Sequence, residues 1–498
     1  MKRIYVITVL MLMGMLPSMW NLQAQTTTAL SRQTSDKSIV RKYGSMVVYY
    51  NCNQDSSIFN FTTNRFNGAT LVHLDSSVRV NDFLMVGNDL YFCGSREDSA
   101  GNHRVYAGVC PISNNSMFLT TRKIFYYDAP EVSAGVKLTD ALKLAVFDQE
   151  EIRRIVMLVE TEDTNGVRAE RMLAELVYND NDSSYVWFTY TEPGTTSSFS
   201  DFAVTDNYVV AASIKQETGE VDLRKFNKPD AGGMTTLFVS DVPDKEYLYK
   251  VNERGKCFTK PYMTCTKGDE VGLAYYGETE DNRKGLIVET LEVGEDIEMT
   301  KQQLDEITNF NIYRQSIKEM KYDITTRQFM LVVQHFTPDS PFFPSSYALT
   351  SGEVRIYSNE SASSTEMKTI NTEGDILYSL DGYTSQVCLT VGTRNGKICL
   401  QKFNILSTGE CCEETMGYTT ILQPVEVEKR YQQRRTDTIQ VTIGPYIENE
   451  GHTTTDGLDI ICTSNGSSHY EGIEEPELVE LTYVMPNPAA GQVTIASS

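Results

Sequence analysis

The sequence lacks the motifs of the common enzyme classes. Its 498 residues contain no HExxH, no GxSxG, no P-loop and no GxGxxG that follows a strand. The 5 histidines are scattered along the chain: His73, His103, His335, His452 and His469. No CxxC pair occurs, and the adjacent Cys411 and Cys412 have no neighbouring His, which excludes the usual zinc patterns. We therefore expect no metal site and no cofactor.

Basic residues are also scarce. Lys and Arg number 44 against 67 Asp and Glu, which gives a formal net charge of −23. Phosphate backbones and anionic lipid headgroups are bound mainly through Lys and Arg. The charge balance therefore argues against nucleic acid as a partner. After residue 24 no apolar run approaches the length of a membrane span, so we expect no membrane insertion of the mature chain.

The N-terminus has the features of an export signal. Lys2 and Arg3 precede an apolar run over residues 4–20, and Ala24 offers a small residue at a cleavage point. This arrangement predicts a signal peptide over residues 1–24. We expect the mature protein to be secreted or held at the outer cell surface, or to stay in the periplasm if a sorting signal fails.

Export permits disulfides, and all 10 cysteines lie in the mature part. If Gly101 and Asn102 form a two-residue hairpin loop, Cys93 and Cys110 face each other across the strands. That pair is the first disulfide candidate, and Cys257 with Cys265 is the second. The alternative is that these residues are buried free thiols.

Helical periodicity is scarce, whereas runs rich in Val, Tyr and Phe recur with internal similarity. "TGEVDLRKFN" from Thr218 matches "NGKICLQKFN" from Asn395, 177 residues later. "ETED" occurs at Glu160 and 118 residues later at Glu278, and Asp201-Phe202 repeats Asp82-Phe83 after 119 residues. These offsets are about three, two and two units of 59 residues. The sequence therefore predicts an all-β repeat protein.

Turn dipeptides recur at the same period. They stand at Gly101-Asn102, Asn165-Gly166, Thr218-Gly219, Lys284-Gly285, Ser351-Gly352, Asn395-Gly396 and Asn465-Gly466. Seven hairpin units of about 60 residues favour a β-propeller of seven four-stranded blades over residues 45–470. We expect the earlier hairpin from Met46 to donate a strand to the last blade and close the ring. Tandem β-sandwiches are the main alternative, because their strands look alike locally.

The C-terminal residues differ from the β-rich repeats that precede them. An acidic linker covers residues 471–483 and is followed by "VMPNPAAGQVTI". Pro486, Asn487, Pro488 and Gly491 resemble the opening of the C-terminal sorting domain that the type IX secretion system of Gram-negative bacteria uses. The resemblance covers residues 484–498, and such domains continue for several more strands, so this one looks truncated. It implies the secretion machinery as a partner if the full domain exists.

Binding has better candidates than catalysis. The segment "TPDSPFFPSSY" over residues 337–347 surrounds Phe342 and Phe343 with prolines and ends at Tyr347, as a contact loop would. Packing of those rings against their own blade is the alternative. We therefore expect a secreted or surface module without a catalytic centre, which binds an extracellular protein or glycan.

The alternative function is an extracellular hydrolase of polysaccharide or peptide, with carboxylates at the channel mouth. Glu160 and Glu278 are conceivable for such a role, although repeated loop charges usually face solvent. Three or more buried groups with perturbed pKa around the channel would favour the enzyme. Ordinary channel side chains with an aromatic patch on a loop would favour binding.

Overall fold

The computed structural model describes residues 26–464 except 45, 64, 67, 99–100, 113–121, 128–135, 150–151, 164–167, 180–184, 191–196, 216, 230–235, 239–244, 252–255, 309–310, 312–313, 340–345, 360–363, 372–374, 384–386, 406–412, 434–445 and 449–452. The regular elements of this part are all β-strands. It contains no helix with the length and apolar character needed to cross a membrane.

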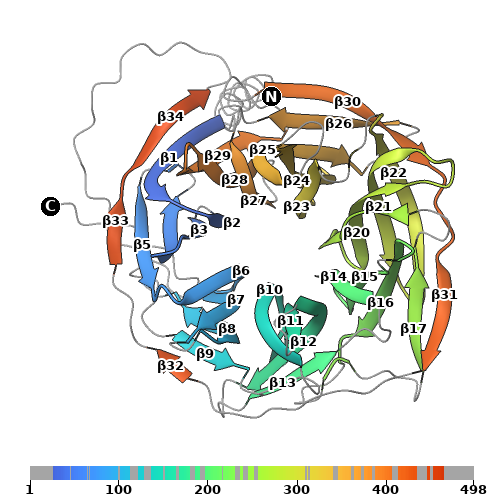
Figure 1. Ribbon diagram of the computed structural model, residues 1–498, viewed down its shortest axis with the longest axis horizontal. Helices are drawn as coiled ribbons and strands as arrows, with labels where there is room; N and C mark the ends of the chain where they lie inside the picture. Colours follow the sequence, from blue (N-terminus) through green and yellow to red (C-terminus); the bar gives the residue numbers. More distant parts are fainter. Residues whose placement is uncertain are drawn as a thin grey trace, which may run out of the picture.

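Seven antiparallel blades stand around a central axis, as Figure 1 shows. Blade 1 consists of β2 (Lys37–Tyr43), β3 (Met46–Cys52), β4 (Ser57–Thr63) and β5 (Ala69–Leu74). Blade 2 consists of β6 (Val78–Val86), β7 (Asp89–Glu97), β8 (His103–Pro111) and β9 (Arg122–Tyr126). Blade 3 consists of β10 (Val136–Gln149), β11 (Ile152–Asp163), β12 (Arg168–Asn179) and β13 (Tyr185–Tyr190). Blade 4 consists of β14 (Ser197–Val204), β15 (Tyr208–Lys215), β16 (Glu220–Asn227) and β17 (Lys245–Lys250).

The other three blades complete the ring. In blade 5 the inner strand is split into β18 (Lys256–Cys257) and β19 (Tyr262–Cys265), followed by β20 (Glu270–Glu278), β21 (Lys284–Val293) and β22 (Ile297–Glu306). Blade 6 consists of β23 (Gln315–Asp323), β24 (Gln328–Pro338), β25 (Tyr347–Ser358) and β26 (Ser364–Asn371). Blade 7 consists of β27 (Ile376–Tyr383), β28 (Val387–Arg394), β29 (Lys397–Asn404) and the N-terminal β1 (Thr26–Thr34). The predicted β-propeller of seven four-stranded blades is confirmed.

The strand that closes the ring is β1, and the closure expected from the Met46 hairpin is wrong. β1 pairs antiparallel with β29, with Ala29 opposite Leu400. The Met46 hairpin instead forms β3 and β4, the centre of blade 1, where Tyr49 and Tyr50 are fully buried. Its near-continuous apolar sequence suits a strand covered on both faces, which an outermost strand is not. The ring therefore begins before residue 45.

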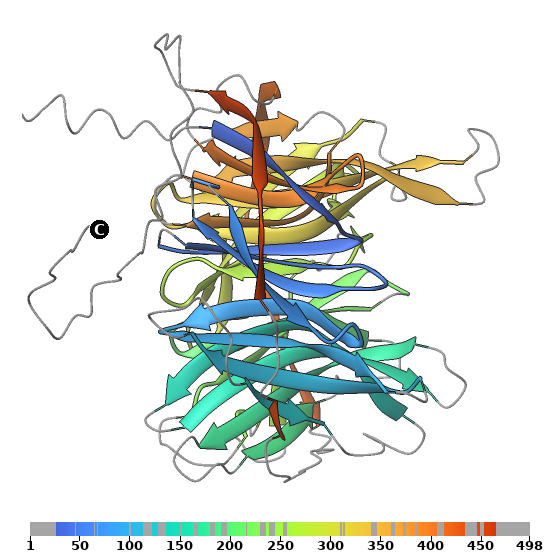
Figure 2. The same cartoon turned by 90° about the vertical axis from the view of Figure 1, so that its left-hand side faces the viewer.

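A second closure device surrounds the ring. Residues 413–464 carry β30 (Glu413–Leu422), β31 (Glu428–Gln433), β32 (Tyr446–Glu448), β33 (Thr453–Asp456) and β34 (Leu458–Ser464), which we call the C-terminal belt. The belt strands pair with β26 and β22, then with β17, β9, β5 and finally β1. Figures 1 and 2 show the belt on the outer rim, running through the blades in the reverse of their chain order before it reaches blade 7. It covers outer strand edges that would otherwise offer unpaired backbone groups.

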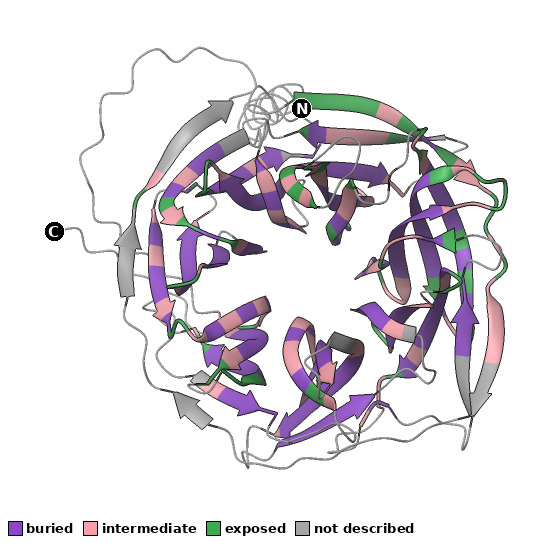
Figure 3. Cartoon of the chain, in the orientation of Figure 1, coloured by how far each residue is buried: buried purple, intermediate pink, exposed green. Residues whose placement is uncertain are grey.

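The hydrophobic core is divided among the blade interfaces. Seven clusters of buried residues are present, and each lies between two neighbouring blades. Figure 3 shows the buried residues concentrated in the blades, while most of β30 is exposed. Trp187 and several tyrosines are fully buried in these layers, so the tyrosines at these positions serve packing.

All three repeats found in the sequence connect equivalent strands. The 177-residue repeat joins β16 of blade 4 to β29 of blade 7, three blades apart. The first "ETED" copy lies at the end of β11, and the second begins at the last residue of β20, two blades further on. The Asp-Phe pairs lie in β6 and β14, which are also two blades apart.

The turn predictions are correct in part. Asn395 and Gly396 join β28 to β29 with φ of 52° and 76°, as a tight hairpin requires. Lys284-Gly285 and Ser351-Gly352 instead lie within β21 and β25. A Cβ at Gly285 would stand 2.0 Å from the carbonyl oxygen of Asp305, so this glycine serves a close approach of two strands. Asn165-Gly166 and Asn465-Gly466 lie outside the described residues.

Both disulfide candidates are wrong, since Cys93, Cys110, Cys257 and Cys265 are free thiols. The loop between β7 and β8 is longer than the two residues expected, and the last strand pair before it is Glu97 with His103. The strand register is therefore shifted, and Cys93 lies opposite Ala107. Cys93 packs between blades 2 and 3, whereas Cys110 packs between blades 1 and 2.

Cys257 and Cys265 fail for a different reason. Both pair with β20, but their partners Gly277 and Val271 lie six residues apart along that strand. At about 3.3 Å per residue this spacing is far beyond the reach of a disulfide.

Several sequence predictions concern residues outside the described part. These are the signal peptide, the acidic linker at 471–483, and Pro486, Asn487, Pro488 and Gly491 of the sorting motif.

Candidate functional site

The inner strands of all seven blades surround a cavity on the axis. It has a volume of about 430 Å³ and receives side chains from β2, β6, β10, β14, β19, β23 and β27. Such a volume is within the range of small-ligand pockets, from about 300 to 1,000 Å³. We call this cavity the axial channel.

β-bulges direct side chains into the axial channel. In five inner strands the pairing with the second strand skips one residue, which bends the strand locally. Five of the skipped residues line the channel, namely Asn81, Leu142, Ser200, Lys318 and Tyr378, whereas Thr139, which β10 also skips, does not. The same irregularity in five inner strands therefore brings amide, apolar, hydroxyl, amino and phenol side chains into the channel.

Carboxylates connect neighbouring inner strands through backbone amides. Each bond crosses from one blade to the next. The amide of Leu144 donates to Asp82 Oδ2 at 3.1 Å, that of Met263 to Asp201 Oδ2 at 2.7 Å, that of Leu380 to Glu319 Oε2 at 2.9 Å, and that of Lys42 to Asp381 Oδ2 at 2.7 Å. These bonds satisfy backbone groups at the inner edge of four blades. The acids therefore have a structural role in holding the ring together.

Cations compensate part of this buried negative charge. Arg41 Nη2 lies 2.6 Å from Asp82 Oδ1, and its Nη1 lies 2.9 Å from Glu319 Oε1. Lys143 Nζ lies 2.7 Å from Asp201 Oδ1. The Arg41, Asp82 and Glu319 side chains are largely buried, and an unpaired buried charge is costly, so these pairs depend on both of their members.

Several channel groups have perturbed pKa values. Burial alone would raise the pKa of Glu319, but the charges of Arg41 and Lys321 bring it down to about 2. Burial raises the pKa of Asp381 despite the nearby cations Lys321 and Arg41. Burial lowers the pKa of Lys37 and of Lys318. The channel thus holds several groups with perturbed pKa values, which would favour an enzyme, although the carboxylates of Glu319 and Asp381 already accept backbone amides.

The residues singled out from the sequence lie elsewhere. Phe342 and Phe343 lie outside the described residues, and Tyr347 is half-buried at the start of β25, opposite Pro338. Glu160 is paired with Arg171 at 2.9 Å, whereas Glu278 lines a different cavity. The structure therefore does not join Glu160 and Glu278 into one site.

Two of the channel acids belong to a repeat that is visible in the sequence. The Asp82-Phe83 and Asp201-Phe202 pairs place an aspartate at the same position of two inner strands. Each carboxylate also accepts the amide of its own following phenylalanine, at 2.9 Å and 2.8 Å. Recurrence of a charged residue in a β-rich repeat was the usable indication.

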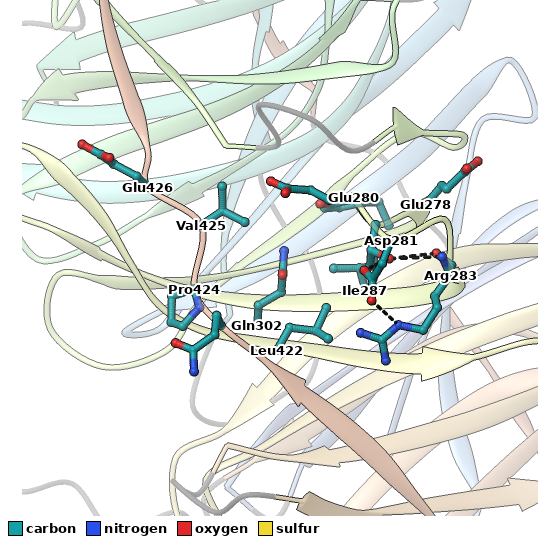
Figure 4. A pocket seen from close by; sticks show the side chains of 13 residues that line it. Glu278, Glu280, Asp281, Arg283, Ile287, Gln302, Leu422, Pro424, Val425 and Glu426 are labelled. Atoms are coloured by element: carbon teal, nitrogen blue, oxygen red, sulfur yellow. Dashed lines mark hydrogen bonds and ion pairs between the residues drawn. The ribbon is translucent and has the colours of Figure 1, made fainter.

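A second cavity of about 470 Å³ lies between the β20–β21 hairpin and belt residues 422–426 (Figure 4). Its lining includes the carboxylates of Glu278, Glu280, Asp281 and Glu426. Arg283 Nε donates to Asp281 Oδ2 at 2.9 Å. Apolar contacts come from Ile287, Leu422 and Val425.

A buried carboxyl group accepts hydrogen bonds from two residues of this lining. Glu289 Oε1 accepts hydrogen bonds from Tyr275 Oη at 2.8 Å and Gln302 Nε2 at 2.7 Å. Glu289 is fully buried, and its burial raises the pKa to about 7. Among the described residues, no group of three His, Cys, Asp or Glu side chains is placed to hold a metal ion.

No protein-family model matches the sequence, and no curated protein sequence does. Solved structures with some similarity include the β-propeller domain of Cps50 (Swd1) from Myceliophteria thermophila, with a TM-score of 0.39, 10% identity, and coverage of 75% of this chain and 98% of that chain. The polysaccharide lyase Uly1 gives a TM-score of 0.39 at 8% identity, covering 75% of this chain and 90% of that chain.

A GH43_12 protein retrieved from a capybara gut metagenome gives a TM-score of 0.22 at 9% identity, covering 88% of this chain and 96% of that chain. At these TM-scores the similarity carries no argument about function.

Proposed function

We propose that this protein is an exported binding module whose ligand, a protein segment or a glycan, enters the axial channel. The observation that supports this proposal is the channel lining, to which all seven inner strands contribute. Hydrogen bonds from backbone amides to Asp82, Asp201, Glu319 and Asp381 link neighbouring inner strands, and a preformed site loses little freedom on binding. Export to the cell surface or the medium is part of the proposal and rests on the sequence of residues 1–24 and 484–498.

The proposal can be tested by blocking the channel. Leu142 lies on a bulge in the channel lining, so Leu142→Trp should fill part of the cavity. The purified mature chain is screened on glycan and protein arrays beside this variant and Tyr347→Ala. We expect Leu142→Trp to lose binding and Tyr347→Ala to retain it. The opposite pattern would move the site to the loop at 337–347 and contradict the channel proposal.

A second candidate function is hydrolysis, and one observation favours it. Glu319 has a pKa of about 2 and Asp381 a raised pKa, and both line the same channel. Carboxyl groups whose pKa values are driven apart can act as base and acid. Turnover of an array ligand by the wild type, abolished in Asp381→Asn, would support this candidate; binding without turnover would support the binding module.

A further inference from the structure

The charge of the axial channel differs from that of the whole protein. The chain as a whole carries a net charge of −23. The channel lining includes seven basic residues, Lys37, Arg41, Lys42, Lys143, Arg171, Lys318 and Lys321, against four acidic ones, Asp82, Asp201, Glu319 and Asp381. A cationic cavity in an acidic protein points to selection for a negatively charged ligand, because low-dielectric walls concentrate the local field.

Most of these cations have carboxylate partners within the protein. Arg41 pairs with Asp82 and Glu319, Lys143 with Asp201, and Arg171 with Glu160. Lys321 lies 3.5 Å from Glu319. Lys37 donates to the amide oxygen of Asn81 and also experiences the charge of Asp140. Their positive charge is therefore largely compensated before any ligand arrives.

Lys318 is different. It is the bulged residue of β23 and lines the channel, and it makes neither an ion pair nor a hydrogen bond with any residue that the structure describes. Its side chain is accessible to solvent within the channel. Surrounding protein lowers its pKa, the charges of Lys37 and Arg171 lower it further, and Glu319 offsets only part of this effect. Its ammonium group therefore has no ion-pair partner among the described residues and is available to an anionic ligand.

Other groups of the channel lining suit a small polar ligand. Tyr262, Tyr378 and Ser200 line the same channel as Lys318, and they offer hydroxyl groups together with two aromatic rings. A volume of about 430 Å³ holds a sugar-sized molecule rather than a folded partner. Charge-assisted hydrogen bonds to an ammonium group are stronger than neutral ones, so an anionic group would gain most beside Lys318.

We propose that the axial channel binds a sugar-sized ligand through an anionic group, a carboxylate, sulfate or phosphate, that contacts Lys318. This inference rests on the proposed function, since it names the ligand class of the same channel. The shared chemistry is one negative charge on a small polar molecule. The comparison of charged sugars with inorganic phosphate decides whether the anion belongs to a sugar or is free in solution.

The test uses calorimetric titration of the mature chain with matched probes. These are glucuronate, glucose 6-sulfate, glucose 6-phosphate, inorganic phosphate and uncharged glucose. Lys318→Gln removes the charge, and the matched control is Lys267→Gln, at an exposed lysine outside the channel lining. Thermal unfolding of each variant verifies that it is folded.

We expect at least one charged sugar to bind at least tenfold more tightly than glucose. Lys318→Gln should weaken that binding at least tenfold, and Lys267→Gln should leave it unchanged. Equal affinity of inorganic phosphate and the charged sugars would support the anion site and assign its ligand to free anions.

Two outcomes would overturn the inference and are distinguishable. If glucose binds as tightly as the charged sugars and Lys318→Gln changes nothing, the anionic class is wrong while the binding channel stands. If no probe binds and Leu142→Trp does not alter any array signal, the inference and the proposed function both fail.

Discussion

Arg41 Nη1 lies 2.9 Å from Glu319 Oε1, and this ion pair joins the first blade of the ring to the sixth. The same guanidinium contacts Asp82 of blade 2, and it donates to Ser379 of blade 7 at 3.2 Å. One side chain thus connects four blades, including both sides of the seam where the ring closes. This position makes Arg41 the clearest target for testing what holds the ring together.

Replacement of Arg41 by Met should destabilise the protein strongly. The variant leaves the buried carboxylates of Asp82 and Glu319 without their cation, and removal of one member of a buried pair costs about 3–5 kcal/mol. Urea unfolding followed by tryptophan and tyrosine fluorescence measures the loss. Arg283→Met is the control, because the Arg283–Asp281 pair is exposed and should leave the midpoint nearly unchanged. Equal effects of the two variants would contradict the assigned role of Arg41.

Glu289 predicts a pH dependence of stability. Its pKa is about 7 in the folded protein, above that of an exposed glutamate, so the native state retains a proton that the unfolded state has lost. The contribution of Glu289 to stability therefore decreases as pH rises from about 4.5 to 7 and then stays constant. Glu289→Gln should gain stability relative to the wild type over that window, by up to about 3 kcal/mol.

The measurement is the free energy of unfolding of both proteins between pH 5 and pH 8. Glu298→Gln on β22 is a suitable control, because Glu298 is exposed. The free energy of unfolding of this variant should change with pH in parallel with that of the wild type. A constant difference between Glu289→Gln and the wild type at every pH would refute a raised pKa at Glu289.

Two glycines of the same hairpin should respond very differently to alanine. A Cβ at Gly392 would stand 2.1 Å from the carbonyl oxygen of Ile376, so the two strands would have to move apart. Gly396 has open space but a φ of +76°, and alanine there costs about 1 kcal/mol through its backbone alone. We expect Gly392→Ala to lose at least about 2 kcal/mol more than Gly396→Ala in chemical unfolding. Equal losses would show that the close strand contact at Gly392 is absent.

The C-terminal belt should protect the outer edges of the ring. A chain that ends at residue 412 exposes strand edges of β5, β9, β17, β26 and β1, which the belt pairs in the complete structure. Exposed edges template association with other chains, so we expect oligomers in light scattering and a lower melting temperature. A chain that ends at residue 464 keeps every belt strand and serves as the control. Two monomeric proteins of equal stability would refute a protective role.

Fold class was accessible from local information. Runs rich in Val, Tyr and Phe, turn dipeptides, and repeats 118, 119 and 177 residues apart are properties of the chain alone, and each of the three repeats joins equivalent strands in the structure. The closing strand was not accessible in this way. β1 contains only polar or small residues and Leu30, so its pairing with β29 and β34 depends on partners more than 360 residues away.

A small error in the predicted length of one hairpin loop was enough to predict the wrong cross-strand pair. A two-residue loop would have placed Cys93 opposite Cys110, whereas the longer loop gives each cysteine another partner and another hydrophobic layer. Likewise, Gly285 and Gly352 are indistinguishable from turn glycines in the sequence, and only the neighbouring strands reveal that they allow close packing.

By itself the sequence determined the β-strands, their repeat length and the acidic surface, because these depend on residues near one another in the chain. Only the tertiary structure decided which strand closes the ring, how the belt runs and which charges meet on the axis. Arg41, Asp82 and Glu319 are far apart in sequence, and their interaction exists only because seven blades bring their inner strands to a common axis.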